Sequence, residues 1–219
     1  MKNTDLILAK DLNGQKIYIK TLEKWLADGN QKELADFFFD RFYTRYLKPF
    51  DYKHKNYITS YKNGFAIMAS CCLLIETFIS YTNNEFKNNR QKSERSFGYF
   101  FLTNKEFICF SEGGLELNKY EKQLTKYLNN RGIPKDFYSN VRCGILHNGE
   151  TKNNWKIIRE GDLFDKKNKT INASEFLKNL VIVIERFRNS LLKADFDNDE
   201  IWKTYKSRLI FMIEKSYTN

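Results

Sequence analysis

The sequence predicts an all-α protein built as a helical bundle. Only 2 of its 219 residues are proline and 10 are glycine, so residues that interrupt helices are scarce. Apolar side chains, among them 19 Phe and 13 Tyr, recur along much of the chain at the three- and four-residue spacing of amphipathic helices. A chain of this length can bury a large core, and no repeat or linker divides it. We therefore expect one domain over residues 1–219.

The first 30 residues predict a small β element followed by a short helix. Two apolar segments, Leu6–Leu8 and Ile17–Ile19, flank Asn13-Gly14, which fits a hairpin or a segment wrapped onto the helical body. Thr21 is suited to cap a helix that continues to Ala27.

A longer helix is expected from Gln31 to Lys48, where Pro49 should end it. Arg41 and Arg45 lie four residues apart and share one face of this helix. They fit either a site for an anionic ligand or, as is more usual, a solvated or ion-paired surface.

The segment from Gly64 to Tyr81 predicts the central helix of the bundle, because it is apolar nearly all round. Its expected buried stripe is formed by Ala66, Ile67, Cys71, Leu74, Ile75 and Phe78. Glu76 interrupts this apolar surface, and a carboxylate there needs a partner. Arg142 is the obvious candidate; the alternative is that Glu76 faces a hydrated groove.

A charged loop is expected from Glu85 to Ser96, after which Phe97–Leu102 returns to the core. A short helix is expected over Leu115–Leu128. Two longer helices should complete the bundle, one capped by Asn172 or Ser174 and ending near Lys193, the other running from Asp199 to Ser216.

Between these parts, Pro134 can open a helix and Asn148-Gly149 can close it in a left-handed C-cap. Arg142 then lies in the middle of the helix and His147 in its last turn. After this helix, Trp155–Ile158 and Lys169–Ile171 flank Asp165–Asn168, which predicts a small two-stranded hairpin resting beside the helix.

The composition limits the class of partner and the compartment. A net charge of +10 fits a polyanionic partner such as RNA or DNA, although Lys and Asn are frequent throughout and form no single basic run.

The four cysteines show no C-x-x-C spacing, which fits free buried thiols in a reducing cytoplasm. No signal-peptide core opens the sequence, and the most apolar run, from Ala66 to Ile79, is short for a membrane span and contains Glu76. We expect a cytoplasmic protein with no membrane partner. Phosphate-loop and dinucleotide-binding motifs and metal-ligand spacings are absent from the sequence, so we expect no cofactor and no metal.

The helix with Arg142 and His147 resembles the signature of the HEPN superfamily, the higher-eukaryote and prokaryote nucleotide-binding helical domains. In that family an Arg is followed, after four to six residues, by a His near the end of a helix. The resemblance extends to the segments Gly64-Phe-Ala-Ile-Met-Ala, Cys72-Leu-Leu-Ile-Glu-Thr77, Phe137-Tyr, Arg142-Cys-Gly-Ile-Leu-His147 and Trp155-Lys-Ile. These segments are similar to a group of bacterial HEPN-like proteins.

The resemblance implies an α-helical bundle that forms a homodimer and cleaves RNA without a metal ion. It also implies a role in toxin–antitoxin, abortive-infection or CRISPR-linked defence, with an antitoxin or other defence protein as partner. The residue after the Arg is often polar in the family, whereas here it is Cys143. Because some members bind RNA or nucleotides without cleaving them, a non-catalytic binding module and a structural subunit are the alternatives.

The chemistry of the two side chains fits RNA cleavage. A histidine has an unperturbed pKa of about 6.5 and can transfer protons near neutral pH, while an arginine presents a permanently charged fork to phosphate oxygens. On an ideal helix, however, Arg142 and His147 lie about 140° apart around the axis and roughly 7.5 Å apart along it. Either the helix loosens near Gly144 and its cap, or two subunits pool their motifs at a twofold axis; we expect the dimer. Asn148 and Glu150 are expected to support His147 or contact substrate, or else only to cap the helix.

Overall fold

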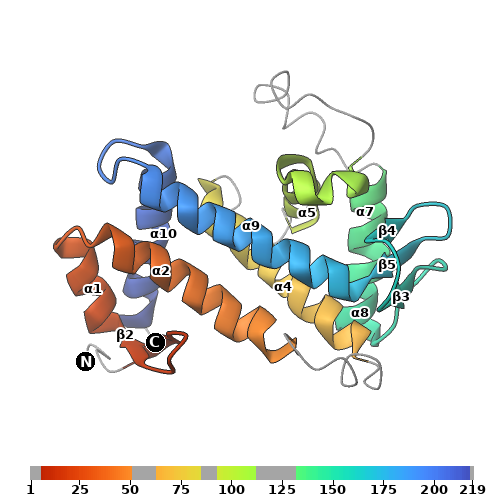
Figure 1. Cartoon of the computed structure of the whole chain (residues 1–219), viewed down its shortest axis with the longest axis horizontal. Coiled ribbons are helices and arrows are strands. Elements are labelled where there is room, and N and C mark those ends of the chain that lie inside the picture. The colour runs from red at the N-terminus through yellow and green to blue at the C-terminus, as the bar shows by residue number, and fades with distance from the viewer. Residues whose placement is uncertain (1–5, 51–62, 85–92, 112–131, 218–219) are drawn as a thin grey trace.

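The computed structural model describes residues 6–50, 63–84, 93–111 and 132–217. It is mostly helical, as predicted, with two small sheets (Figure 1). The α-helices are α1 Ile19–Ala27, α2 Gln31–Phe42, α4 Gly64–Thr82, α5 Ser93–Thr103, α7 Ile133–Phe137, α8 Cys143–Asn148, α9 Ala173–Lys193 and α10 Glu200–Tyr217. Shorter helical segments are the π turns η1 Tyr43–Leu47 and η7 Tyr138–Arg142 and the 3₁₀ segments η2 Lys48–Phe50 and η5 Lys105–Phe110.

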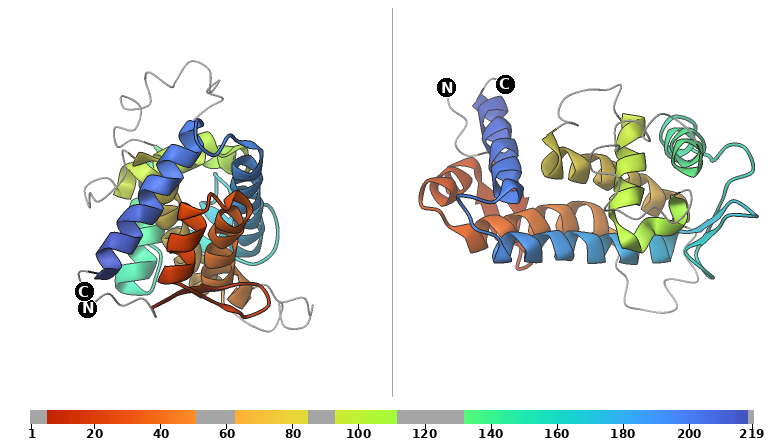
Figure 2. Two further views of the ribbon diagram at one scale, coloured as in Figure 1. Left: turned by 90° about the vertical axis from the view of Figure 1, so that its left-hand side faces the viewer. Right: turned by 90° about the horizontal axis from the view of Figure 1, so that it is seen from above.

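Three long helices form the centre of the fold. Helix α9 packs against both α2 and α4, and α10 lies across one end of α4 (Figures 1 and 2). The other end of the group carries α5, α7, α8 and the second sheet (Figure 1). The helix that carries Arg142 and His147 is therefore held at one end of the molecule, against the start of α4.

The aromatic residues form the interior. Phe38 of α2 contacts the rings of Phe42, Phe78, Phe187 and Tyr205. A second group packs against the motif helix, which is the continuous helical segment formed by α7, η7 and α8. This group consists of Phe97, Phe101, Phe107, Phe110, Phe137 and Phe176. Nearly all of the buried apolar residues in the described part of the chain belong to one contiguous core. Burial of so many large rings contributes strongly to the stability of this helical fold.

Helix α4 is the predicted core helix, and most of its apolar side chains are buried. Phe65, Ala66 and Leu73 are exposed, so the prediction that Ala66 is buried was wrong and one side of the helix faces outward. By length and composition α4 is apolar enough to cross a membrane, but 56% of its most apolar window is buried inside the protein. This burial is typical of the core helix of a soluble protein.

The N-terminal hairpin is confirmed as β1 Ile7–Lys10 paired antiparallel with β2 Lys16–Tyr18. Thr21 does not cap the next helix, because α1 already begins at Ile19. Arg41 and Arg45 both donate hydrogen bonds to the carbonyl oxygen of Leu8 in β1. The shared face of these arginines therefore clamps the hairpin to α2.

The second sheet differs from the predicted two-stranded hairpin. Strand β3 Lys156–Ile158 pairs in parallel with β5 Thr170–Asn172, and β4 Phe164–Asp165 pairs antiparallel with β5. The turn over Asp165–Asn168 does form a hairpin, but it joins β4 to β5. A strand of two residues gives no readable alternation in the sequence, so the apolar pattern favoured β3 as the partner instead.

The other element boundaries agree with the predictions only in part, since α2 ends at Phe42 and not at Lys48. Asn172 caps α9, because its Oδ1 accepts the N–H groups of Ser174 and Glu175. Helix α5 starts at Ser93, so Ser93–Ser96 belongs to a helix and not to the expected loop. Pro49 lies inside a 3₁₀ turn after a π turn and does not end the helical path at Lys48. The predicted helix over Leu115–Leu128 lies outside the described residues.

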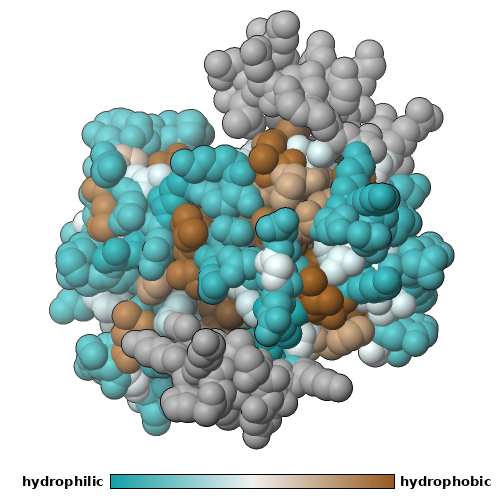
Figure 3. Space-filling view, turned by 45° about the vertical axis from the view of Figure 1, so that its right-hand side comes forward, coloured by the Kyte–Doolittle hydropathy of each residue, from teal (hydrophilic) through white to brown (hydrophobic). Residues whose placement is uncertain are grey.

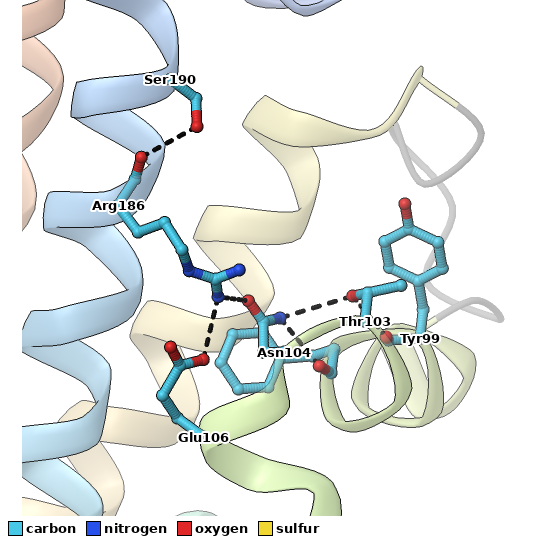
Figure 4. Close-up of polar contacts among 7 residues, drawn as sticks. Tyr99, Thr103, Asn104, Glu106, Arg186 and Ser190 are labelled. Carbon is cyan, nitrogen blue, oxygen red and sulfur yellow. Dashed lines mark hydrogen bonds and ion pairs between the residues drawn. The ribbon is translucent and has the colours of Figure 1, made fainter. Parts of the chain in front are cut away.

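A polar cluster ties the segment after α5 to α9 (Figure 4). Arg186 of α9 donates to Asn104 Oδ1 at 2.8 Å and to Glu106 Oε2 at 2.9 Å. Asn104 is buried and also donates to the carbonyl oxygen of Phe100. The cluster therefore ties η5 and the end of α5 to α9.

Candidate functional site

The motif helix is built as predicted at both ends. Its first part, α7, has Pro134 in its first turn, and α8 ends at Gly149, whose φ of 71° is left-handed. The N–H of Gly149 donates to Ile145 O and that of Glu150 to Gly144 O. These bonds satisfy carbonyl groups that the last helical turn leaves open. Arg142 lies mid-helix and His147 in the last turn.

Gly144 allows the chain to fold back over the end of α8. A Cβ atom on this residue would lie 2.5 Å from the carbonyl oxygen of Glu150 and 3.3 Å from Cα of Thr151. Since both contacts involve main chain, no side-chain rotation can relieve them. A glycine at position 144 therefore sets how the residues after His147 leave the helix.

Arg142 is held by Glu76 from the core helix α4. Its Nε donates to Oε1 at 2.7 Å and its Nη2 donates to Oε2 at 3.1 Å. The side chains of Arg142 and Glu76 are only 15% and 23% exposed. This geometry is the bidentate Arg–carboxylate pair, and it confirms the predicted partner of Glu76. It fixes the plane of the guanidinium and leaves Nη1 as the corner of the fork that Glu76 does not engage.

Two further side chains border this guanidinium. The Tyr138 ring lies 5.4 Å from Cζ of Arg142, and Cys143 contributes to the pKa shifts of both residues. Partial burial alone would lower the pKa of Arg142, but the hydrogen bond and charge of Glu76 raise it above its usual value. Burial, with Cys143 next, raises the pKa of Tyr138. Arg142 is thus a permanent cation and Tyr138 a neutral phenol around it.

His147 approaches the open corner of Arg142. Its Nε2 lies 3.4 Å from Nη1 of Arg142, at the outer limit of a hydrogen bond, and its side chain is exposed. A guanidinium only donates, so this contact requires an unprotonated Nε2. The two side chains meet within one chain, because the long Arg142 side chain spans the angle that separates the two positions on the helix. The expectation that only a second subunit or a loosened helix end brings them together was therefore wrong.

The two other predicted supporting residues do not join this group. Asn148 and Glu150 are exposed at the end of α8. Within the described part of the chain, neither side chain hydrogen-bonds to Arg142 or His147. Their structural contribution is the main-chain N–H of Glu150, which fits the capping alternative.

Sequence reasoning missed a polar network on another side of the same helix. Asn140, which is buried, donates to Asp136 Oδ1 at 2.8 Å and accepts from Asn153 Nδ2 at 2.8 Å. Asp136 also accepts from Nε1 of Trp155 and pairs with Lys169 at 3.2 Å. The four-residue spacing of Asp136 and Asn140 was the available signal. The network attaches the second sheet to the motif helix.

The described residues include no group of three or more His, Cys, Asp and Glu side chains arranged to hold a metal ion. Comparison of the chain with family models, with curated proteins and with solved structures finds no match. The chemistry of the site therefore has to be argued from its own geometry. That geometry is a fixed, partly buried cation beside an exposed imidazole.

Proposed function

We propose that this protein is an HEPN-type endoribonuclease that cleaves RNA at Arg142 and His147 without a metal ion. The observation that carries the proposal is the meeting of Arg142 Nη1 with the exposed His147 Nε2, while Glu76 holds the rest of the guanidinium. A cation fixed beside a group that can transfer protons is what phosphodiester transesterification requires.

In the proposed reaction, the 2′-oxygen of a ribose attacks the adjacent phosphorus and the bond to the 5′-oxygen breaks. When the phosphate binds, Arg142 Nη1 exchanges its contact with His147 Nε2 for the phosphorane oxygens, where it stabilises the developing negative charge, and the freed Nε2 takes the 2′-OH proton. A protonated imidazole, that of His147 itself or that of a second motif, then gives its proton to the 5′-oxygen. The products are a 2′,3′-cyclic phosphate and a free 5′-OH, and atoms and charges balance without a redox step.

We also propose a homodimer, now on chemical grounds. One proton must be removed and another supplied during the reaction, and one imidazole can do both only in succession. Two motifs at a twofold axis would supply two imidazoles to one phosphate. The resemblance to HEPN proteins further supports a toxin or anti-phage effector in the cytoplasm, restrained by an antitoxin or defence-system protein.

The decisive experiment incubates the purified protein with labelled single-stranded RNA in EDTA and scores both retention of RNA and product ends. His147→Ala and Arg142→Ala are expected to lower cleavage at least 100-fold, since each removes a group that acts in the transition state. Cyclic-phosphate ends should accompany wild-type cleavage. Undiminished cleavage by either variant would contradict the assigned roles.

A second function, RNA binding without cleavage, is favoured by one observation. Glu76 neutralises Arg142 and occupies two of its three nitrogen atoms, so the cation is less available to a phosphate than an unpaired arginine. Under this alternative, wild-type protein retains RNA in a salt-sensitive manner and yields no products. A purely structural subunit would retain none.

A further inference from the structure

A groove lies between the motif helix and the second sheet, separate from the Arg142–His147 pair. It has a volume of about 660 Å³ and is lined in part by Lys135, Ser139, Asn153, Phe164, Lys166 and Lys169. Its walls come from α7, η7, the segment after α8 and the β4–β5 hairpin. The end of the molecule that carries this sheet is largely hydrophilic, with apolar side chains showing between the polar ones (Figure 3).

The charge of the groove is positive. Among the described residues, three lysines line it, and the single acidic lining residue, Asp136, is already engaged by Asn140, Trp155 and Lys169. The ammonium groups therefore exceed the carboxylates by two. A groove of this kind attracts a polyanion, and lysines recognise phosphates as point charges.

The groove also carries backbone strain at two of its lining residues. Lys169 has φ of 51° and Asn153 has φ of 50°, both in the left-handed region. Asparagine tolerates that conformation, whereas lysine at φ > 0 is uncommon. Glycine or asparagine would fit the turn at lower cost, so the lysine is there for its side chain, which pairs with Asp136 at 3.2 Å and lines the groove. Strained residues of this kind concentrate at binding sites.

We propose that this groove binds single-stranded RNA next to the cleavage site, with Lys135, Lys166 and Lys169 on successive phosphates. The inference rests on the proposed function for its choice of polyanion. The groove and the Arg142–His147 pair lie on different sides of one helix, so a strand bound in the groove has to continue around this helix to reach the pair. Asn153 gives one amide hydrogen to Asn140 and keeps its carbonyl oxygen for a base edge.

The test measures binding and cleavage separately. A fluorescent single-stranded RNA of about 16 nucleotides is titrated in EDTA by anisotropy with His147→Ala protein, which binds without cutting. In this background, Lys135→Gln, Lys166→Gln and Lys169→Gln together are expected to weaken binding at least tenfold. The logarithm of the association constant falls linearly with the logarithm of the salt concentration. The steepness of this line should decrease by about 2, or roughly 0.7 for each phosphate that a lysine no longer neutralises.

Two controls keep the proposal falsifiable. Lys10→Gln, Lys16→Gln and Lys24→Gln remove the same charge from exposed positions at the opposite end of the molecule and should change affinity less than threefold (Figure 1). Lys169→Gly removes one groove charge and the ion pair with Asp136 but relieves the left-handed backbone, so the two effects on thermal stability should largely offset each other while RNA binding weakens. Equal losses in the two triple variants, or no RNA binding by the His147→Ala protein, would overturn the proposal. RNA binding that depends on the groove in a wild-type protein that does not cleave would instead contradict only the proposed nuclease activity.

Discussion

Glu76 and Arg142, separated by 66 residues in the sequence, form two hydrogen bonds of 2.7 Å and 3.1 Å between the core helix and the motif helix. The pair positions the guanidinium whose Nη1 faces His147. Glu76 does not contact the imidazole in this arrangement, so we assign it a positioning role.

Glu76→Gln is expected to reduce RNA cleavage about 10- to 100-fold, mainly in kcat, because Arg142 loses the partner that fixes its orientation. The substitution also leaves a largely buried cation without its counter-charge, which should lower the free energy of unfolding by about 2 kcal/mol. Cleavage kinetics and denaturant unfolding measure the two effects.

Glu106→Gln is the matched control for loss of an arginine pair. Glu106 is more deeply buried than Glu76 and pairs with Arg186 at 2.9 Å, away from the motif helix (Figure 4). The Glu106→Gln variant should lower the free energy of unfolding by about as much as Glu76→Gln while leaving kcat within about threefold of wild type. Equal loss of kcat in both variants would show that Glu76 acts only through stability.

The Glu76–Arg142 pair could be predicted because a carboxylate inside an apolar helix requires a cation, and the motif helix offers one. The C-cap at Gly149 followed from the Asn-Gly signal. Both rest on strong local physical requirements that a single sequence displays.

Other features depend on geometry that residue spacing does not encode. The π turn over Tyr138–Arg142 shows no deviation in the apolar pattern, and the parallel pairing of β3 with β5 is set by contacts across the sheet. Positions on an ideal helix predicted that Arg142 and His147 point in different directions, but the long Arg142 side chain reaches His147. Side-chain length therefore decided the geometry of the candidate site.

Gly144→Ala is expected to lower both stability, by about 2 kcal/mol, and cleavage, by at least tenfold. The added Cβ would lie 2.5 Å from Glu150 O, so the main chain after His147 must move. Gly149→Ala provides the comparison. A Cβ atom at position 149 has no neighbour within 4 Å, so this substitution should lower the free energy of unfolding by only about 1 kcal/mol, through strain in the left-handed backbone. Thermal unfolding and cleavage of both variants test this, and a functional Gly144→Ala protein would contradict the assigned role of the tight turn.

The cysteines are expected to differ in reactivity. Cys71 and Cys72 are fully buried in α4, and burial raises the pKa of both thiols well above the usual range. Cys109 is exposed in η5; partial burial of its thiol raises its pKa too, but backbone hydrogen bonds oppose this and the surface position keeps the thiol accessible. At pH 8, Ellman's reagent should label Cys109 in the native protein and Cys71 and Cys72 only after unfolding. Cys109→Ser should remove the native labelling at that position; native reaction of Cys72 would contradict the position of α4 in the core.

Two aspartates one turn apart on α2 should give stability opposite dependences on pH. Burial, with the charges of Asp36 and Asp11, raises the pKa of Asp40 to about 6. The folded protein therefore keeps this proton between about pH 4 and pH 6, where the unfolded chain has lost it, and stability falls as pH rises through that window. Asp40→Asn removes the effect. The free energy of unfolding of this variant should equal that of wild type at pH 4 and exceed it by about 1 kcal/mol at pH 7. This value already allows for solvent screening of a partly exposed carboxyl group.

Asp36 should give the opposite dependence of stability on pH. Burial opposes ionisation of its carboxyl, but hydrogen bonds from Lys32 and Arg188 lower its pKa below the usual value. Its contribution is present above the unfolded pKa of about 4 and is lost as pH falls through the folded pKa. Asp36→Asn should therefore cost about 1 kcal/mol at pH 7 and progressively less below pH 4. Urea unfolding of both variants at pH 3, 4, 5.5 and 7 measures the two trends, and parallel pH profiles would contradict the different environments assigned to the two carboxyl groups.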